Sequence, residues 1–132
     1  MNMVLDYAHL ALNVKDMEKS IEFYEKVFGF TKAFSLKDEN GNPWIEYVKV
    51  CKGKFIELFY NNDKPNAGSF NHMCFQVDDI QETAKRITDA GAPLTIPPKM
   101  GVDGNWQCWT VDPDGNKIEL MQYAENAMQL QY

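Results

Sequence analysis

The sequence contains little that would bind nucleic acid, cross a membrane or build a disulfide framework. Its 132 residues include 13 Lys and Arg against 19 Asp and Glu, giving a net charge of −6, whereas phosphate binding requires clustered basic side chains. No apolar run approaches the ~18 residues of a membrane span, and the opening residues have no pattern of a secretory signal. The three cysteines are odd in number and widely spaced, which argues against disulfides and thiolate zinc sites. We therefore expect a cytoplasmic protein without nucleic-acid or membrane partners.

Histidine is also scarce, and its two occurrences open an internal repeat. His9 begins the segment His-Leu-Ala-Leu-Asn-Val, and His72 begins His-Met-Cys-Phe-Gln-Val. An amphipathic helix is expected after each segment, over residues 15–29 and 78–91, because apolar residues there recur at helical spacing. Asp16 and Asp79 are suited to cap the two helices.

Strand-like segments separated by turn residues follow each helix. The expected strands cover residues 31–36, 44–50 and 54–60 in the first half, and 94–96, 106–111 and 116–122 in the second. The sequence therefore predicts an α+β protein made of two βαβββ repeats. We expect one domain over residues 1–132, with repeats at about 5–61 and 69–122 and a C-terminal tail at 123–132.

Each repeat also ends in the same tripeptide, Ile-Glu-Leu, which contains Glu57 or Glu119. The distance from histidine to glutamate is 57 − 9 = 48 residues in the first half and 119 − 72 = 47 in the second. Because alternate side chains of a strand point to opposite faces, all four residues fall on the faces away from the helices.

Any one of these four side chains could simply be solvated, but together they predict a metal site. If the two faces form a cleft, the carboxylates of Glu57 and Glu119 would lie close together and partly dehydrated, which costs several kcal/mol per unpaired ion. A divalent cation would cancel both charges and bind the imidazoles of His9 and His72. Such a donor set suits Ni, Co, Zn, Mn or Fe better than Mg or Ca.

These residues carry a resemblance to a known family. The order His, Glu, His, Glu on paired βαβββ units resembles the vicinal oxygen chelate (VOC) superfamily and, within it, glyoxalase I (lactoylglutathione lyase). The most specific segments are residues 13–24 with Gly29-Phe30, Glu57-Leu-Phe-Tyr-Asn61, and Asp112-Pro-Asp-Gly-Asn-Lys-Ile-Glu119. The likeness extends from about residue 5 to residue 122.

The resemblance implies the glyoxalase/bleomycin resistance/dioxygenase fold, an eight-stranded half-barrel cleft with the metal at its base, completed in a homodimer. It implies a lyase or isomerase that converts the hemithioacetal of a 2-oxoaldehyde through an enediolate. One divalent transition metal would be held by His9, Glu57, His72 and Glu119. Glu119 would act as the catalytic base, with Glu57 as its counterpart in the other repeat.

Further residues are predicted to bind the small-molecule substrate. By resemblance, Asn61 matches an asparagine that contacts the thiol peptide, whereas Asn13 stands where glutathione-using members carry an arginine; Lys99 could partly compensate for that missing charge. Phe55 and Phe59 flank Glu57 and are expected to give the cleft apolar walls. Trp106 is a further candidate, along with the other two tryptophans, although large aromatics are more often core or interface residues.

Other functions are compatible with the fold. One alternative is another metal-dependent VOC isomerase, epimerase or dioxygenase that acts on a hydroxy-ketone or sugar-like substrate. By resemblance, the acyl-CoA epimerases usually have Gln where Glu57 stands, and extradiol dioxygenases use two His and one Glu. A metal-free drug-binding resistance protein is the other alternative, but such proteins lack the four-residue ligand set.

The edges of an open half-barrel need covering, which favours association of two copies. We predict that light scattering at micromolar concentration will give about twice the monomer mass of 15.2 kDa. A strict monomer under these conditions would contradict the expected homodimer.

Overall fold

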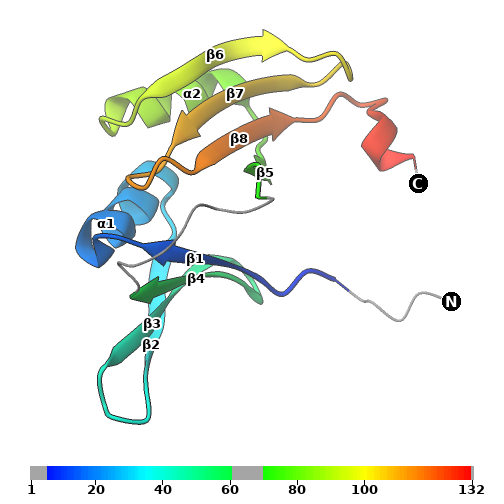
Figure 1. The fold of residues 1–132 in the computed structure, drawn as a ribbon. Helices are drawn as coiled ribbons and strands as arrows, with labels where there is room; N and C mark the ends of the chain where they lie inside the picture. The colour runs from blue at the N-terminus through cyan, green and yellow to red at the C-terminus, as the bar shows by residue number, and fades with distance from the viewer. Residues whose placement is uncertain (1–5, 61–69, 132) are drawn as a thin grey trace, which may run out of the picture. The chain divides into compact units, whose positions relative to one another are not determined.

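The structure, a computed structural model, describes residues 6–60 and 70–131 and divides into two compact units. The first unit contains β1 (His9–Val14), α1 (Met17–Phe28), β2 (Thr31–Lys37), β3 (Pro43–Cys51) and β4 (Lys54–Tyr60). Its four strands form one sheet in the order β1-β4-β3-β2 (Figure 1). The first and last strands pair in parallel, and the remaining neighbours are antiparallel.

The second unit repeats this arrangement. It contains β5 (Met73–Gln76), α2 (Ile80–Asp89), β6 (Leu94–Met100), β7 (Trp106–Val111), β8 (Lys117–Gln122) and the short 3₁₀ helix η1 (Met128–Leu130). The strand order is β5-β8-β7-β6, again with a parallel pair between the opening and closing strands. The predicted α+β class and the two βαβββ repeats are therefore confirmed.

Side-chain caps define where both helices begin. The carboxylate of Asp16 accepts a hydrogen bond from the backbone N–H of Lys19, and the carboxylate of Asp79 accepts from those of Gln81 and Glu82. These bonds satisfy amide groups that lack partners in the first helical turn. The first helix ends at Gly29, whose φ of 72° is a left-handed conformation that glycine adopts without steric cost.

One strand is longer than the sequence indicates. The sequence predicts only a short strand at residues 94–96, because Pro97 and Pro98 follow, but β6 continues to Met100. Proline is tolerated there because β6 is an edge strand and its register against β7 shifts on both sides of Ile96. The prolines lie where the ladder is already interrupted.

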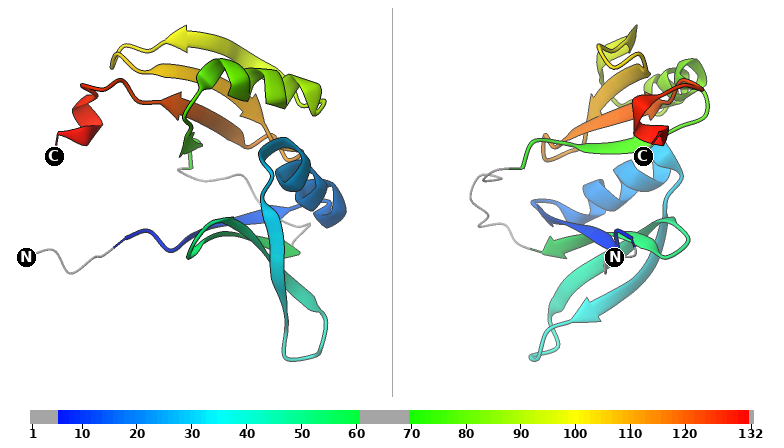
Figure 2. Two further views of the ribbon diagram at one scale, coloured as in Figure 1. Left: turned by 180° about the vertical axis from the view of Figure 1, so that it is seen from behind. Right: turned by 90° about the vertical axis from the view of Figure 1, so that its right-hand side faces the viewer.

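Each sheet buries one face beneath its helix, and this face is the core of the unit (Figure 2). The apolar residues least accessible to solvent in the first unit are Val14, Tyr24, Val48, Ile56 and Leu58, and those in the second are Ile87, Cys108, Ile118 and Leu120. Tyr24 and Ile87 come from the two helices, and the others follow the alternation expected for strands packed on one side. The opposite sheet faces hold His9, Glu57 and Glu119.

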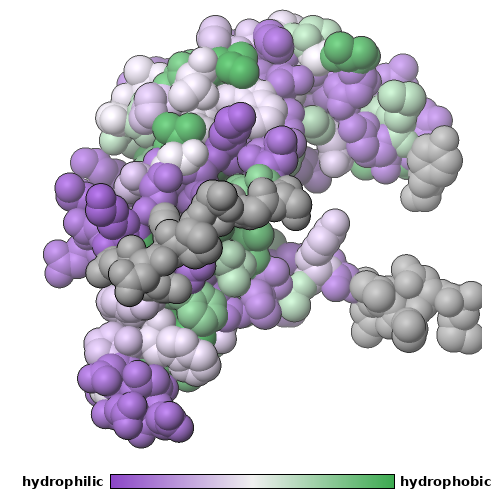
Figure 3. All heavy atoms as spheres, viewed as in Figure 1, coloured by the Kyte–Doolittle hydropathy of each residue, from purple (hydrophilic) through white to green (hydrophobic). Residues whose placement is uncertain are grey.

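The ends of the strands are polar. The turn between β2 and β3 forms a hydrophilic tip (Figure 3), in which the carboxylate of Asp38 accepts hydrogen bonds from the backbone N–H groups of Asn40 and Asn42. Within the two described ranges, no helix is long and apolar enough to cross a membrane.

We predict that Leu58→Ala lowers the free energy of unfolding by about 2–5 kcal/mol, because this fully buried side chain leaves a cavity in the first unit. Urea denaturation followed by circular dichroism measures the change. Leu36→Ala removes the same atoms from a strand position that is 39% exposed, so it should cost less than about 1 kcal/mol. Equal effects of the two substitutions would contradict this description of the core.

Candidate active site

A histidine and a nearly buried glutamate meet on the sheet face of the first unit that points away from α1. The parallel register of β1 and β4 aligns His9 with Phe55 and Ala11 with Glu57, so the two side chains lie on one face of adjacent strands. Nε2 of His9 is 2.9 Å from Oε2 of Glu57. The glutamate side chain is 8% exposed and the histidine 49%, so the imidazole faces solvent and covers the carboxylate.

The second unit has the equivalent pair. Nε2 of His72, which immediately precedes β5, is 3.3 Å from Oε1 of Glu119 on β8. Nδ1 of His72 lies 2.6 Å from Oδ1 of Asn71. Because an amide oxygen can only accept, the Nδ1–H group of the ring donates this hydrogen bond. In the neutral ring, Nε2 then carries a lone pair directed at an anionic carboxylate. Such an arrangement is favourable when a cation lies between these groups, or when the ring itself is charged.

Each glutamate has a further polar neighbour. Burial, followed by the charge of Glu57 and a hydrogen bond to it, raises the pKa of Tyr47, which lies directly opposite Glu57 in the ladder. Burial, followed by the charge of Glu119, raises the pKa of Cys74 to about 12. The hydroxyl and the thiol are therefore both protonated at neutral pH. The thiol of Cys74 donates a weak hydrogen bond to the backbone carbonyl of Phe75, at 3.9 Å.

The aromatic ring beside the second pair belongs to Trp109. Its ring centroid is 4.8 Å from that of His72, and its indole N–H donates to Oε1 of Gln107 at 2.6 Å. Trp109 lies directly opposite Glu119 in the ladder, whereas Trp106 shares the opposite face with the buried Cys108. The structure thus places Trp109, and not Trp106, beside the histidine–glutamate pair.

The other residues predicted to bind substrate are distributed over both units. Asn13, Phe55 and Phe59 share the sheet face of His9 and Glu57. Lys99 lies opposite Gln107 in the second unit, on the face of Glu119. Asn61 is outside the described residues.

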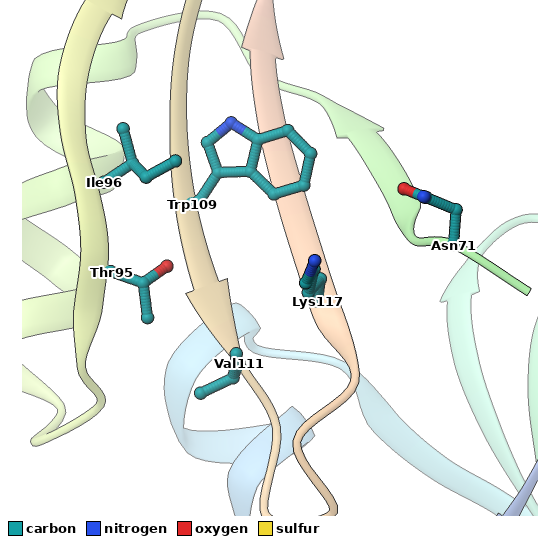
Figure 4. Close-up of a pocket in the computed structure, with 6 residues that line it drawn as sticks. All are labelled: Asn71, Thr95, Ile96, Trp109, Val111 and Lys117. Atoms are coloured by element: carbon teal, nitrogen blue, oxygen red, sulfur yellow. The ribbon is translucent and has the colours of Figure 1, made fainter. Parts of the chain in front are cut away.

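A pocket of about 350 Å³ lies on the same face of the second unit (Figure 4). Its lining residues come from the segment before β5 and from β6, β7 and β8: Asn71, Thr95, Ile96, Trp109, Val111 and Lys117. Trp109 contributes both to this pocket and to the contact with His72. The pocket therefore adjoins the second histidine–glutamate pair, since Asn71 and Trp109 contact His72 and also line the pocket.

The residues fit a divalent transition metal in their donor chemistry. Two imidazole nitrogens and two carboxylates form a set typical of zinc, nickel, cobalt, manganese or iron sites. The structure brings together one His and one Glu within each unit, and the assembly of all four around one ion stays a prediction. Within residues 6–60 and 70–131, His, Cys, Asp and Glu side chains form no ready-made group of three or more that could hold a metal.

Sequence reasoning did not single out Tyr47, and it left open which face of β7 bears the functional tryptophan. Both residues lie opposite a glutamate in an antiparallel ladder. Counting outward from the turn between β7 and β8 could have identified Trp109, because that ladder is regular. The same count from the turn between β3 and β4 would have missed Tyr47, because the register shifts between Lys49 and Cys51.

Comparisons with known proteins agree with this arrangement. A sequence model of the Glyoxalase/Bleomycin resistance protein/Dioxygenase superfamily matches residues 6–120. A protein of Vibrio cholerae named probable lactoylglutathione lyase is 35% identical over 123 residues, which cover 86% of this chain and 88% of that protein. A probable trivalent organoarsenical cleaving enzyme of Bacillus subtilis is 31% identical over 93% of this chain and 84% of its own length.

The fold of a solved structure is also similar. A superfamily member from Sphaerobacter thermophilus superposes with a TM-score of 0.75 at 28% identity, covering 92% of this chain and 100% of that one.

We predict that His9→Ala and His72→Ala will each reduce bound metal severely and to a similar extent, because they remove equivalent donors. Elemental analysis of protein purified without added metal gives the stoichiometry. Cys74→Ala is the control, since it alters a neighbour of Glu119 without removing a predicted ligand, and it should keep the metal. Full metal occupancy in either histidine variant would refute the assignment.

Proposed function

Because the chain belongs to the Glyoxalase/Bleomycin resistance protein/Dioxygenase superfamily, we propose that it is a metal-dependent lyase of the glyoxalase I type. Its substrate would be the hemithioacetal formed by a 2-oxoaldehyde and a thiol. The proposal includes a cytoplasmic homodimer that holds one divalent transition metal per chain with His9, Glu57, His72 and Glu119.

The observation that carries this proposal is the repetition of a histidine–glutamate pair. In both units the imidazole Nε2 faces a carboxylate oxygen, and the carboxylate is more than nine-tenths buried. Two such pairs provide two neutral nitrogen donors and two negative charges for one dication. The curated relatives named probable lactoylglutathione lyase support the same reading, with identities up to 35%.

The reaction moves one proton between adjacent carbons of the substrate. The carbon that bears the sulfur loses its proton, and the neighbouring carbonyl carbon gains it. The hydroxyl on the first carbon also gives up its proton as it becomes the thioester carbonyl, and the former carbonyl oxygen gains one as it becomes the hydroxyl, so a hydroxy-thioester results without net oxidation. The metal, when bound, lowers the energy of the negative charge that develops on the substrate oxygens. A side chain must hold the proton during the transfer, and a carboxylate is the suitable base on this face.

Glu119 is better suited to hold this proton than Glu57. Tyr47 lies directly opposite Glu57 in the ladder, and a phenol is a good hydrogen-bond donor to a neighbouring carboxylate. The equivalent donor near Glu119 is the thiol of Cys74, which donates only weakly. Glu119 is also near the pocket, because Trp109, which lies opposite it in the ladder, lines the pocket. We therefore assign the transfer of the proton to Glu119.

The alternative functions predict different substrates for the same protein. A VOC isomerase, epimerase or dioxygenase of another kind would act on a hydroxy-ketone or sugar-like compound, and a metal-free resistance protein would bind a drug without turnover. The similarity to a probable organoarsenical cleaving enzyme makes a trivalent organoarsenical a further compound to assay. Full metal content without turnover of any thiol hemithioacetal would refute the glyoxalase proposal and favour these alternatives.

We predict that Glu119→Gln lowers kcat for a methylglyoxal hemithioacetal by about 10²–10⁴-fold, because glutamine retains an oxygen ligand but cannot accept the proton. Initial rates of thioester formation by metal-loaded protein measure the effect, with metal content determined on the same samples. Glu125→Gln is the matched control, because this glutamate is exposed in the C-terminal tail. If Glu119→Gln retained wild-type kcat, the base would have to be another residue.

A further inference from the structure

The two units differ in what occupies the sheet face beside the glutamate. In the first unit this place is filled by the aromatic rings of Phe34, Tyr47 and Phe55, which come from three adjacent strands. Their ring centroids are 4.1 Å apart for Phe34 and Tyr47, and 5.9 and 6.0 Å from these rings to Phe55. Phe34 lies opposite Tyr47, Tyr47 lies opposite Glu57, and Phe55 precedes Glu57 by two residues. The three rings form a closed aromatic wall.

The second unit has different residues at the same ladder positions. Ile96 lies opposite Trp109, Trp109 lies opposite Glu119, and Lys117 precedes Glu119 by two residues. These three side chains line the pocket of about 350 Å³ instead of closing the surface. Where the first unit has the aromatic ring of Phe55, the second unit therefore has the positive charge of Lys117, at the wall of an open pocket.

The environment of this charge indicates what the pocket binds. Ile96, Trp109 and Val111 provide most of an apolar surface around Lys117 (Figure 4). Among the residues that the structure describes, none forms a hydrogen bond or an ion pair with the Lys117 ammonium. Lys117 is exposed, so its ammonium is solvated when the pocket is empty. Its position at the edge of an apolar surface suits a ligand that has an anionic end on an apolar body, since the ammonium can contact the anion while the body covers the apolar wall.

We propose that this pocket binds an anionic group carried by the thiol portion of the substrate, with the Lys117 ammonium contacting a carboxylate and Trp109 packing on the adjoining carbon chain. This inference rests on the proposed function. Lys117 and Glu119 are alternate residues of one strand, about 7 Å apart along it. A carboxylate a few bonds from the sulfur can therefore reach Lys117 while the reacting carbon lies at Glu119.

The location explains how an anionic thiol could be recognised although Asn13 is neutral. On this proposal Lys117 of the second unit supplies the positive charge. The equivalent position in the first unit is occupied by Phe55. The substrate class is then the hemithioacetal of a short mercapto acid. A neutral thiol of the same length would bind more weakly.

The binding test compares two ligands that differ only in charge, 3-(methylthio)propionate and its methyl ester. Neither can form a hemithioacetal, so binding is measured without turnover. In zinc-loaded protein, the indole N–H signal of Trp109 in ¹H–¹⁵N spectra reports occupancy of the pocket, and titration gives Kd. We expect the carboxylate to bind about tenfold or more tightly than the ester, which is the scale of a charge-assisted hydrogen bond.

Three variants locate this preference. Lys117→Met should abolish it, and Lys117→Arg should retain it because the charge is kept. Lys85→Met is the control for a change in net charge, because Lys85 lies on α2 in an exposed pair with Asp89, and it should behave as wild type. Equal binding of the two ligands by wild type, or an unchanged preference in Lys117→Met, would overturn the inference.

A turnover experiment separates this inference from the proposed function. The substrates are the methylglyoxal hemithioacetals of 3-mercaptopropionate and of its neutral methyl ester. For the 3-mercaptopropionate adduct, Lys117→Met should raise KM about tenfold or more and leave kcat nearly unchanged, the pattern of lost uniform binding. If wild type turns over neither thiol adduct but retains the Lys117-dependent binding preference, the glyoxalase activity fails and the subsite stands. If wild type turns over both adducts and Lys117→Met changes neither KM, the subsite fails and the activity stands.

Discussion

Two buried carboxylates constrain the functional face of this protein. As whole residues, Glu57 and Glu119 are 6% and 7% exposed. An unpaired carboxylate in such a position costs several kcal/mol of stability. Each one has an imidazole and a protonated hydroxyl or thiol beside it, so the surrounding side chains are arranged to stabilise negative charge. The parallel pairing of the opening and closing strands makes this possible, since it brings together residues that lie almost a whole repeat apart in sequence.

The repeat provides a common framework on which the two halves have diverged. Both units keep the strand order, the helix caps and the histidine–glutamate pair. They differ where side chains project from that framework, with Tyr47 and Phe55 on one sheet and Trp109 and Lys117 on the other. This divergence makes one glutamate a neighbour of an aromatic wall and the other a neighbour of a pocket. The proposal that Glu119, and not Glu57, transfers the proton depends on these few side chains.

Much of the framework could be predicted from sequence, because it depends on local patterns. Periodic apolar residues, two aspartate caps and the repeated Ile-Glu-Leu tripeptide were sufficient to predict both helices and the face of each glutamate. The extension of β6 across Pro97 could not be predicted, because it depends on the irregular ladder with β7. The roles proposed for Tyr47 and Lys117 could not be predicted, for a related reason. These roles depend on which residues lie opposite Tyr47 and Lys117 on the adjacent strands. The periodicity of apolar residues along one strand gives no information on that register.

The parallel strand pairs also have a consequence for how the chain folds. Among the strands formed by residues 6–60 and 70–131, β1 pairs only with β4, and β5 pairs only with β8. Neither opening strand can join its sheet until the closing strand has been made, so each sheet must be completed by a contact between distant segments, which is slow compared with forming a helix or a hairpin. During synthesis the first unit can close once Tyr60 has left the ribosome, while the second is still emerging. The order of the strands thereby lets the two similar halves fold in succession and reduces mispairing between them.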